Sequence, residues 1–563
     1  MKIKNILGGV FCMALLASCA DDMDYHEYSN YDKDYVFNNF DNTVGFVTNI
    51  YSYLDDDFAN GSAMQASACD ESEYAWKSNI INNFTNGMLS ATNTPSLFSF
   101  YKPIREANYY LAHFKECDFS ENKFDKDYAN QMKRFNRLQY EVRFLRAYFY
   151  AHLVTYYGDV PFTTDVLTED EANALNRTPA KTIMDFVVKE CDEICNQLPA
   201  NYATLTDDAA AGETGRVSKL AVLALKARVL LYEASPLFNT SGDNELYHQA
   251  ALASKAVIDS CTAYGKSLGK YKDLWGTDNW SASEVILARR IGDSNSLETG
   301  NYPMGVENGN SGNCPTQTLV DAYEMKETGK LWNEEGSGYD PQNPYAGRDP
   351  RLAWSIVCNG DTKWPSYNTD SIETFYGGKN GLPTVGATPT GYYLKKYLDS
   401  SVNISSVNSN TKRHSWITFR LGEFYLDYAE ATFKYLGSAD AISTELSMSA
   451  VDAVNVIRRR KGVLMPKLAT GLNNDDFWKK YENERMVELA FECHRYNDIR
   501  RWKEGPQHAN IDEMKITKNA DGTMTYTRNT VKRVWEDKLY FWPIPRTEML
   551  KHTSSDFKQN AGW

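Results

Sequence analysis

Residues 483–502 concentrate side chains that could do chemistry: they read NERMVELAFECHRYNDIRRW and predict one helix carrying Glu, His, Asp and Arg. Residues three or four apart share a helix face. Glu488 and Glu492 therefore lie on one face, whereas His494 points to nearly the opposite face and has only Asp498 as an acidic neighbour. A zinc site needs three or four ligands that converge on one point, and this spacing supplies two.

Carboxylates interleaved with arginines on such a helix more often form structural ion pairs than a catalytic pair. We therefore predict that this stretch belongs to the architecture. The basic run RRRK, from Arg458 to Lys461, ends another predicted helix, where the helix dipole favours positive charge. We expect it to form a solvated last turn.

Other chemical motifs give little support for catalysis. The sequence contains no glycine-rich phosphate loop and no GxSxG motif, and its eight His show no metal-binding spacing. We predict no metal site and no cofactor. Two carboxylates across a cleft could still serve as the acid and base of a glycoside hydrolase, so that alternative stays open.

The composition describes a globular chain without a nucleic-acid partner. Its 563 residues are 42% hydrophobic and 24% charged, which suffices for a large core. The formal net charge is −14. Phosphate binding needs clustered Lys and Arg, so nucleic acid is a poor candidate partner.

Helical periodicity dominates two blocks, 37–264 and 416–502. Alanine stripes in the first block predict a closely packed helix pair, as in tetratricopeptide-like repeats; they are Ala221, Ala224 and Ala227, then Ala250, Ala253 and Ala256. Residues 265–415 are rich in Gly, Asn, Pro and Ser, with short β-like runs such as EVILARRI and LAWSIV. We predict a mainly α fold in which helix pairs form a scaffold and a loop-rich region of small strands is inserted for ligand binding.

The N-terminus has the form of a secretory signal peptide over residues 1–18, with Lys2 and Lys4 before an apolar segment and small residues. The end of this segment, LASC, resembles a bacterial lipobox, in which the Cys becomes the lipidated first residue. We expect Cys19 to be the lipid anchor and 19–36 to be an acidic tether. No later run predicts a membrane span, so the lipid would be the only membrane attachment.

Several stretches in this order resemble the SusD/RagB family of surface glycan-binding lipoproteins. They are the lipobox with its acidic tail, EVRFLRAYFYAHLVTYYGDVPF (141–162), DPRL (349–352), FRLGEFYLDYAEA (419–431), the 483–502 stretch, and FWPIPRTEML with KQNAGW at the C-terminus. The acidic residues after Cys19 look like the export signal of Bacteroidota surface lipoproteins. One departure is Cys493, where the family usually carries Gly.

This resemblance implies a binding protein and not an enzyme. It predicts one SusD-like domain over 37–563, in which 503–563 is a C-terminal framework segment. The scaffold would lie as a hinged lid over a partner, a SusC-type TonB-dependent transporter in the outer membrane, and would deliver a captured glycan to it. The alternatives are a secreted glycoside hydrolase and a repeat scaffold that binds only protein.

Sugar rings present flat C–H faces rimmed by hydroxyls, so a receptor needs aromatic planes with polar groups beside them. Trp76, with Asp70 nearby, and Trp280, after GTDN, are the best predicted platforms; ordinary packing is the alternative for each. The further candidates are Trp332, Tyr345 and Trp364. Trp275 is discounted, because family members tend to carry a packing residue there. Six other tryptophans suit the core: Trp354, Trp416, Trp478, Trp502, Trp535 and Trp542.

Overall fold

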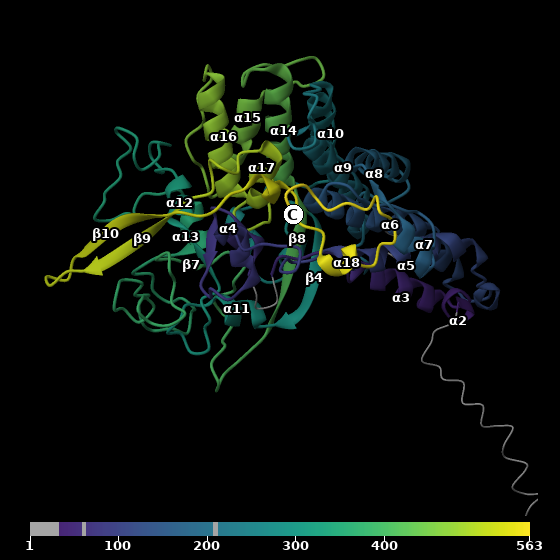
Figure 1. Ribbon diagram of the computed structural model, residues 1–563, viewed down its shortest axis with the longest axis horizontal. Coiled ribbons are helices and arrows are strands. Elements are labelled where there is room, and N and C mark those ends of the chain that lie inside the picture. Colours follow the sequence, from purple (N-terminus) through teal and green to yellow (C-terminus); the bar gives the residue numbers. More distant parts are fainter. Residues whose placement is uncertain (1–32, 59–62, 206–211) are drawn as a thin grey trace, which may run out of the picture.

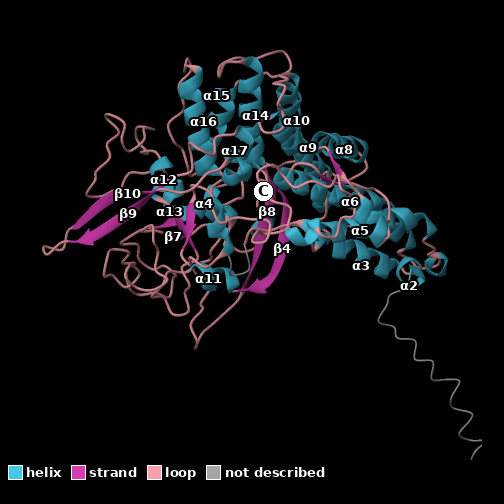
Figure 2. Ribbon diagram, in the orientation of Figure 1, coloured by secondary structure: helices cyan, strands magenta, loops and turns pink. Residues whose placement is uncertain are grey.

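The structure is a computed structural model that describes residues 33–58, 63–205 and 212–563. The predicted signal peptide, Cys19 and the acidic residues after it lie outside the described residues. The long helices occupy one side of the molecule, and loops, strands and short helices occupy the other (Figure 1, Figure 2). The predicted mainly α fold is confirmed.

The first helical block packs around the long helix α6 (Tyr128–Tyr157), which ends at Gly158 with a φ of 69°. The other helices of this block are α2 (Lys33–Phe37), α3 (Phe40–Tyr51), α5 (Tyr101–His113), α7 (Glu169–Ala174), α8 (Ala180–Ile194), α9 (Lys219–Ala234) and α10 (Glu245–Ala263). The short helix α4 (Asn83–Asn86) lies apart from them (Figure 1). Helix α6 contacts α3, α5, α8 and α9, so its C-terminal half is buried on every side.

Helices α9 and α10 form the predicted alanine-rich pair. Ser218 caps α9 by accepting a hydrogen bond from the backbone N–H of Ala221. Ala221, Ala224 and Ala227 are fully buried, and their small side chains let the helices approach closely. The face of α10 turned to the core differs from the prediction: Ala253 and Ala256 are only half-buried, and the buried positions are Ala250, Ala251, Ser254, Val257, Ile258 and Cys261.

The second helical block stands beside the first, with α14 packed on both α10 and α15 (Figure 1). Its helices are α14 (Leu421–Leu436), α15 (Ala450–Arg458), α16 (Asn474–Glu488) and α17 (Arg495–Trp502); the short α18 (Arg546–Met549) follows near the C-terminus. The prediction of one helix over 483–502 was wrong. The chain turns between α16 and α17, where Phe491 and Cys493 have φ values of 60° and 66°.

The described strands pair in twos, and every pair is antiparallel. The pairs are β1 (Ser72–Tyr74) with β5 (Asn313–Pro315), β2 (Val160–Pro161) with β3 (Arg177–Thr178), β4 (Val285–Ser294) with β8 (Lys412–Arg420), β6 (Ile356–Val357) with β7 (Tyr393–Leu394), and β9 (Ile511–Lys518) with β10 (Met524–Val531). The β9–β10 hairpin projects at the end of the molecule farthest from α2 and α3 (Figure 1).

The loop-rich region has a hydrophobic core of its own, which includes Tyr302, Tyr392 and Ile372. Its helices are α11 (Ser296–Asn301), α12 (Gln317–Ala322) and α13 (Pro350–Ser355). LAWSIV is therefore mostly helix and not strand. Asp349 caps α13 by accepting from the backbone N–H of Arg351 at 2.9 Å, and Pro350 starts the helix, because proline suits the first helical position.

Candidate functional site

The carboxylates of the 483–502 stretch lie in a buried network of ion pairs. Glu488 is fully buried and accepts hydrogen bonds from Arg351 at 2.9 Å, Arg420 at 2.8 Å and Arg460 at 2.6 Å. Burial alone would raise the pKa of Glu488, but these three guanidinium groups outweigh it and lower the pKa to about 2. Glu488 is therefore a charged structural partner.

The rest of the stretch has the same character. Arg501 donates two hydrogen bonds to the buried Glu430, and Arg485 donates to Asp498 at 2.7 Å. His494 is buried, and burial lowers its pKa well below the ordinary value. A neutral histidine among paired charges suits a framework position better than a catalytic one.

The solvated turn expected for the RRRK run is only half right. Arg459 and Lys461 are exposed, but Arg458 and Arg460 are buried. Arg458 donates to Glu484 at 2.8 Å, and Arg460 pairs with Glu284 and Glu488. These carboxylates come from distant parts of the chain and compensate the buried charge.

Trp280 lines a cavity of about 360 Å³ between the start of β4 and the described residues 200–203 and 214–218. The neighbouring Asn279 is buried, and its amide donates to the carbonyl oxygens of Leu274 and Ser415, which fixes the backbone that carries the ring. The cavity also exposes hydroxyl, amide and cationic groups from Asn201, Thr214, Arg216, Ser281, Lys266 and Arg290. Its volume falls within the range of about 300–1,000 Å³ usual for small-ligand pockets.

Arg290 is stacked on Trp280, with its guanidinium carbon 3.4 Å from the ring centroid. The same guanidinium donates to the carbonyl oxygen of Thr214 at 2.7 Å. It also lies against Gly215, where a Cβ atom would be only 3.2 Å from Arg290 and where φ is +106°. Glycine at this position therefore makes room for the stacked arginine.

Trp76 is half-buried, and contacts of its indole ring fix its position. Its Nε1 donates to the carbonyl oxygen of Asn310 at 2.9 Å, and a Cβ at Gly386 would lie 2.6 Å from the ring. The loop that ends at Gly386 exposes Tyr376, whose exposed fraction is 69%. Sequence reasoning missed Tyr376, although an aromatic residue before two glycines in a loop meets the criterion used for the tryptophans.

Trp332 and Tyr345 are brought together at the β9–β10 hairpin. Arg528 on β10 stacks on Trp332 with its guanidinium carbon 3.3 Å from the ring centroid, and Tyr526 on the same strand meets Tyr345 edge-on at 5.8 Å. Residues two apart on a strand share a face. One face of the hairpin therefore carries both predicted aromatic residues, each already in contact with a protein side chain.

Asp70 and Trp364 are buried. Arg495 donates to both carboxylate oxygens of Asp70, at 2.9 and 2.8 Å, and these contacts outweigh burial to lower the pKa of Asp70. Trp364 is 7% exposed and meets Tyr302 edge-on. Their burial argues against direct contact with a glycan. Trp275, discounted from the sequence, is also buried.

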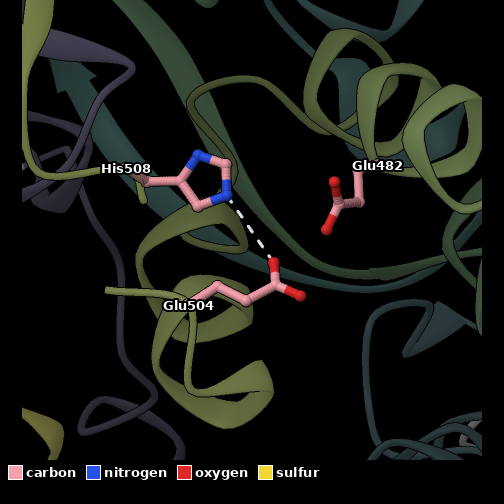
Figure 3. A group of neighbouring side chains, drawn as sticks. All are labelled: Glu482, Glu504 and His508. Carbon is pink, nitrogen blue, oxygen red and sulfur yellow. Dashed lines mark ion pairs between the residues drawn. The ribbon is translucent and has the colours of Figure 1, made fainter. Parts of the chain in front are cut away.

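Glu482 on α16 faces Glu504 and His508, which follow α17 (Figure 3). The His508 Nε2 lies 3.6 Å from a Glu504 oxygen, and one ligand atom from each of the three residues lies within 4.8 Å of the others. Burial raises the pKa of Glu482, and the adjacent Glu504 raises it further. Hydrogen bonds from His508 and Glu482 outweigh burial and lower the pKa of Glu504. These opposite pKa shifts are those expected when two adjacent carboxylates share one proton.

A histidine and two carboxylates are also ligands that zinc accepts. Here, however, Arg495 lies 2.9 Å from the Nδ1 of His508, and the ammonium group of Lys434, stacked over Trp478, interacts with both glutamates. These positive charges already compensate the carboxylates. The absence of a metal site stays a prediction from the sequence.

Asp55 and Asp57 line a small cavity together with His152 and His494. That cavity has a volume of about 70 Å³. It is several times smaller than the pockets that hold small ligands, so a sugar ring does not fit between these carboxylates.

Within the part of the chain that the structure describes, no helix is both long and apolar enough to cross a membrane.

Two family models match the chain: one described as "SusD family" over residues 283–563, and one described as "Starch-binding associating with outer membrane" over 24–231. The chain is 25% identical over 386 residues to SusD-like protein P25 of Formosa agariphila, a match that spans 64% of this chain and 63% of that protein.

Solved structures share the fold over nearly the full length. A SusD-like protein from Bacteroides fragilis NCTC 9343 has a TM-score of 0.75 at 26% identity, with 94% of this chain and 98% of that chain covered. A SusD-like carbohydrate-binding protein from the same organism has a TM-score of 0.72 at 23% identity, with 93% and 100% covered. The chain belongs to the SusD family.

Proposed function

We propose that this protein binds a glycan at the outer membrane and delivers it to a SusC-type TonB-dependent transporter. The Trp280 cavity is the main structural support for this binding site. It combines an aromatic ring with hydroxyl, amide and cationic donors in a space large enough for a sugar unit. Trp76 forms a second candidate platform.

Membership of the SusD family and the description of the matching model as starch-binding and outer-membrane-associated support this proposal. A solved laminarin-binding SusD-like protein shares the fold, with a TM-score of 0.62. The lipobox at Cys19 and the transporter partner rest on the sequence resemblance. A binding role without catalysis fits the carboxylates of the 483–502 stretch, which form ion pairs with arginines.

The test is binding of the purified protein to a panel of neutral and acidic polysaccharides, measured by affinity electrophoresis and then by calorimetry. Trp280→Ala should weaken binding of the best ligand by about 2 kcal/mol, or about thirtyfold in Kd, as expected for loss of an aromatic anchor. Trp76→Ala tests the second platform in the same assay.

Phe124→Ala is the matched control, because Phe124 is 92% exposed and lies away from both platforms in the sequence. It should bind like the unaltered protein. Prolonged incubation with the bound polysaccharide should yield no new reducing ends. Glycan cleavage by the pure protein would overturn the binding-only function, and unchanged binding by Trp280→Ala would overturn the site.

A further inference from the structure

The Trp280 cavity carries an unusual balance of charge. Arg216, Lys266 and Arg290 line it, and no aspartate or glutamate is among its described lining residues. The chain as a whole is strongly acidic, with 74 Asp and Glu against 60 Lys and Arg. A cationic cavity on such a protein is a local feature that the composition does not explain.

One of the three cations is already neutralised. Arg216 donates to Glu141 at 2.9 Å and pairs with Glu213 at 2.7 Å. It is only 12% exposed at its side chain, so it belongs to the wall of the cavity.

The other two cations have no carboxylate within ion-pair distance among the described residues. Arg290 donates to the carbonyl and hydroxyl oxygens of Thr214, and Lys266 donates to the carbonyl oxygen of Val285. Partial burial lowers the pKa of both groups; for Arg290 the nearby Arg413 lowers it further, and Asp278 offsets only part of this. Each cation therefore gains from an anion brought close to it.

The backbone holds Arg290 in place. Gly215 leaves room for the guanidinium, and the Trp280 ring supports one of its faces. A guanidinium fixed in this way loses little conformational freedom when it binds a planar carboxylate or a sulfate. Sites for neutral sugars, in contrast, need acceptors as well as donors for the hydroxyl groups, and no carboxylate is among the described residues that line this cavity.

Resting on the proposed function, we infer that the Trp280 cavity receives a sugar unit that carries a negative charge, a carboxylate or a sulfate, with Arg290 and Lys266 as its charge partners. The ring of Trp280 packs against the sugar face, and the two cations select for the acidic substituent. The preferred ligand is thus an acidic polysaccharide.

Calorimetry with charged and uncharged forms of one polymer tests this inference. The probes are polygalacturonate with its carboxyl-reduced form, and dextran sulfate with dextran. One acidic probe should bind at least about tenfold more tightly than its uncharged form, and the advantage should shrink at high salt. Arg290→Gln and Lys266→Gln should each weaken binding of that probe about tenfold, whereas Arg290→Lys keeps the charge but not the stacked guanidinium and should bind with intermediate affinity.

Lys189→Gln is the charge-matched control, because Lys189 lies on α8 and its side chain is 75% exposed. It should leave binding unchanged. If a neutral polysaccharide of the wider panel binds, depends on Trp280 and is unaffected by Arg290→Gln, the inference falls while the proposed function stands. Equal binding of charged and uncharged probes also overturns the inference. Failure of every polysaccharide to bind overturns both.

Discussion

Cys493 is a thiol in a turn, and its backbone conformation explains its position better than its reactivity does. Its φ of +66° lies in the left-handed region that favours glycine, which agrees with the glycine that the family usually carries there. The thiol donates to the Gln65 side-chain oxygen at 2.8 Å, and burial raises its pKa well above the ordinary value. Cys493 is thus a packing residue in a turn, and a thiolate is disfavoured.

The shared proton between Glu482 and Glu504 makes stability depend on pH. Folding raises the pKa of Glu482 above its ordinary value of 4.5. Between the ordinary pKa and the raised pKa of the folded state, folded Glu482 keeps a proton that the unfolded chain has released. This contribution to stability therefore falls as the pH rises. Glu482→Gln removes the effect, and we expect the variant to be more stable than the unaltered protein by about 1 kcal/mol near pH 8.

Thermal unfolding between about pH 5 and about pH 9 measures this difference. Glu335→Gln, at an exposed loop position, is the control and should leave the pH profile unchanged. A larger advantage of Glu482→Gln at low pH than at high pH would contradict the shared proton. A rise in Tm on adding zinc, lost in Glu482→Gln, would instead identify a metal site.

Helix α16 is the element that joins the two parts of the fold. Its Glu484 and Glu488 accept hydrogen bonds from arginines on α13, on α15 and at the end of β8. Glu488→Gln leaves buried guanidinium groups with too little negative charge, so we expect the free energy of unfolding to drop by about 3–5 kcal/mol. Urea unfolding of the purified variant measures the drop.

Lys255→Ala provides the comparison on a surface helix. Lys255 pairs with Asp259 on α10, and the Asp259 side chain is 60% exposed. Loss of such a pair should cost no more than about 1 kcal/mol. If Glu488→Gln and Lys255→Ala lowered the free energy of unfolding equally, the buried ion pairs of α16 would not be a special source of stability.

The sequence predicted the helices better than the ion-pair partners of their charged residues. Spacing alone placed Glu488 and Glu492 on one helix face; both do meet Arg420, but Glu492 lies beyond the end of α16. It did not predict that Arg458 and Arg460 are buried, because their partners Glu324 and Glu284 lie far away in the sequence. It also continued one helix through the turn at Cys493, since helical periodicity persists across that turn.

At the scale of the whole molecule, apolar periodicity predicted the helical blocks, and the change in composition predicted the loop-rich region between them. That this region would build its own core around residues such as Tyr302 and Tyr392 was not predictable, because loop residues carry no periodic signal. The same gap affected the site: the Trp280 ring was predicted, but the cations beside it come from a strand and a loop that only the fold brings together.

Membrane attachment is the prediction that concerns the molecule as a unit. The lipobox predicts that Cys19 carries the lipid that holds the protein at the membrane. Cys19→Ala should move the protein from the membrane fraction to the soluble fraction and abolish labelling with a radioactive fatty acid. Ser18→Ala keeps the cysteine and should remain anchored. Membrane association of Cys19→Ala without a lipid would contradict the anchor.

The buried charges around Glu488 also set an order of events during synthesis. Arg351 precedes its partner Glu488 by 137 residues, and Glu284 precedes Arg420 by 136. As a chain emerges from the ribosome, its early part can fold first, but Arg351 lacks its partners Glu484 and Glu488 until α16 has been made. A chain that stops before α16 therefore cannot close its centre, and it remains open to proteases. Closure of the buried ion-pair network thus requires synthesis of the chain through α16.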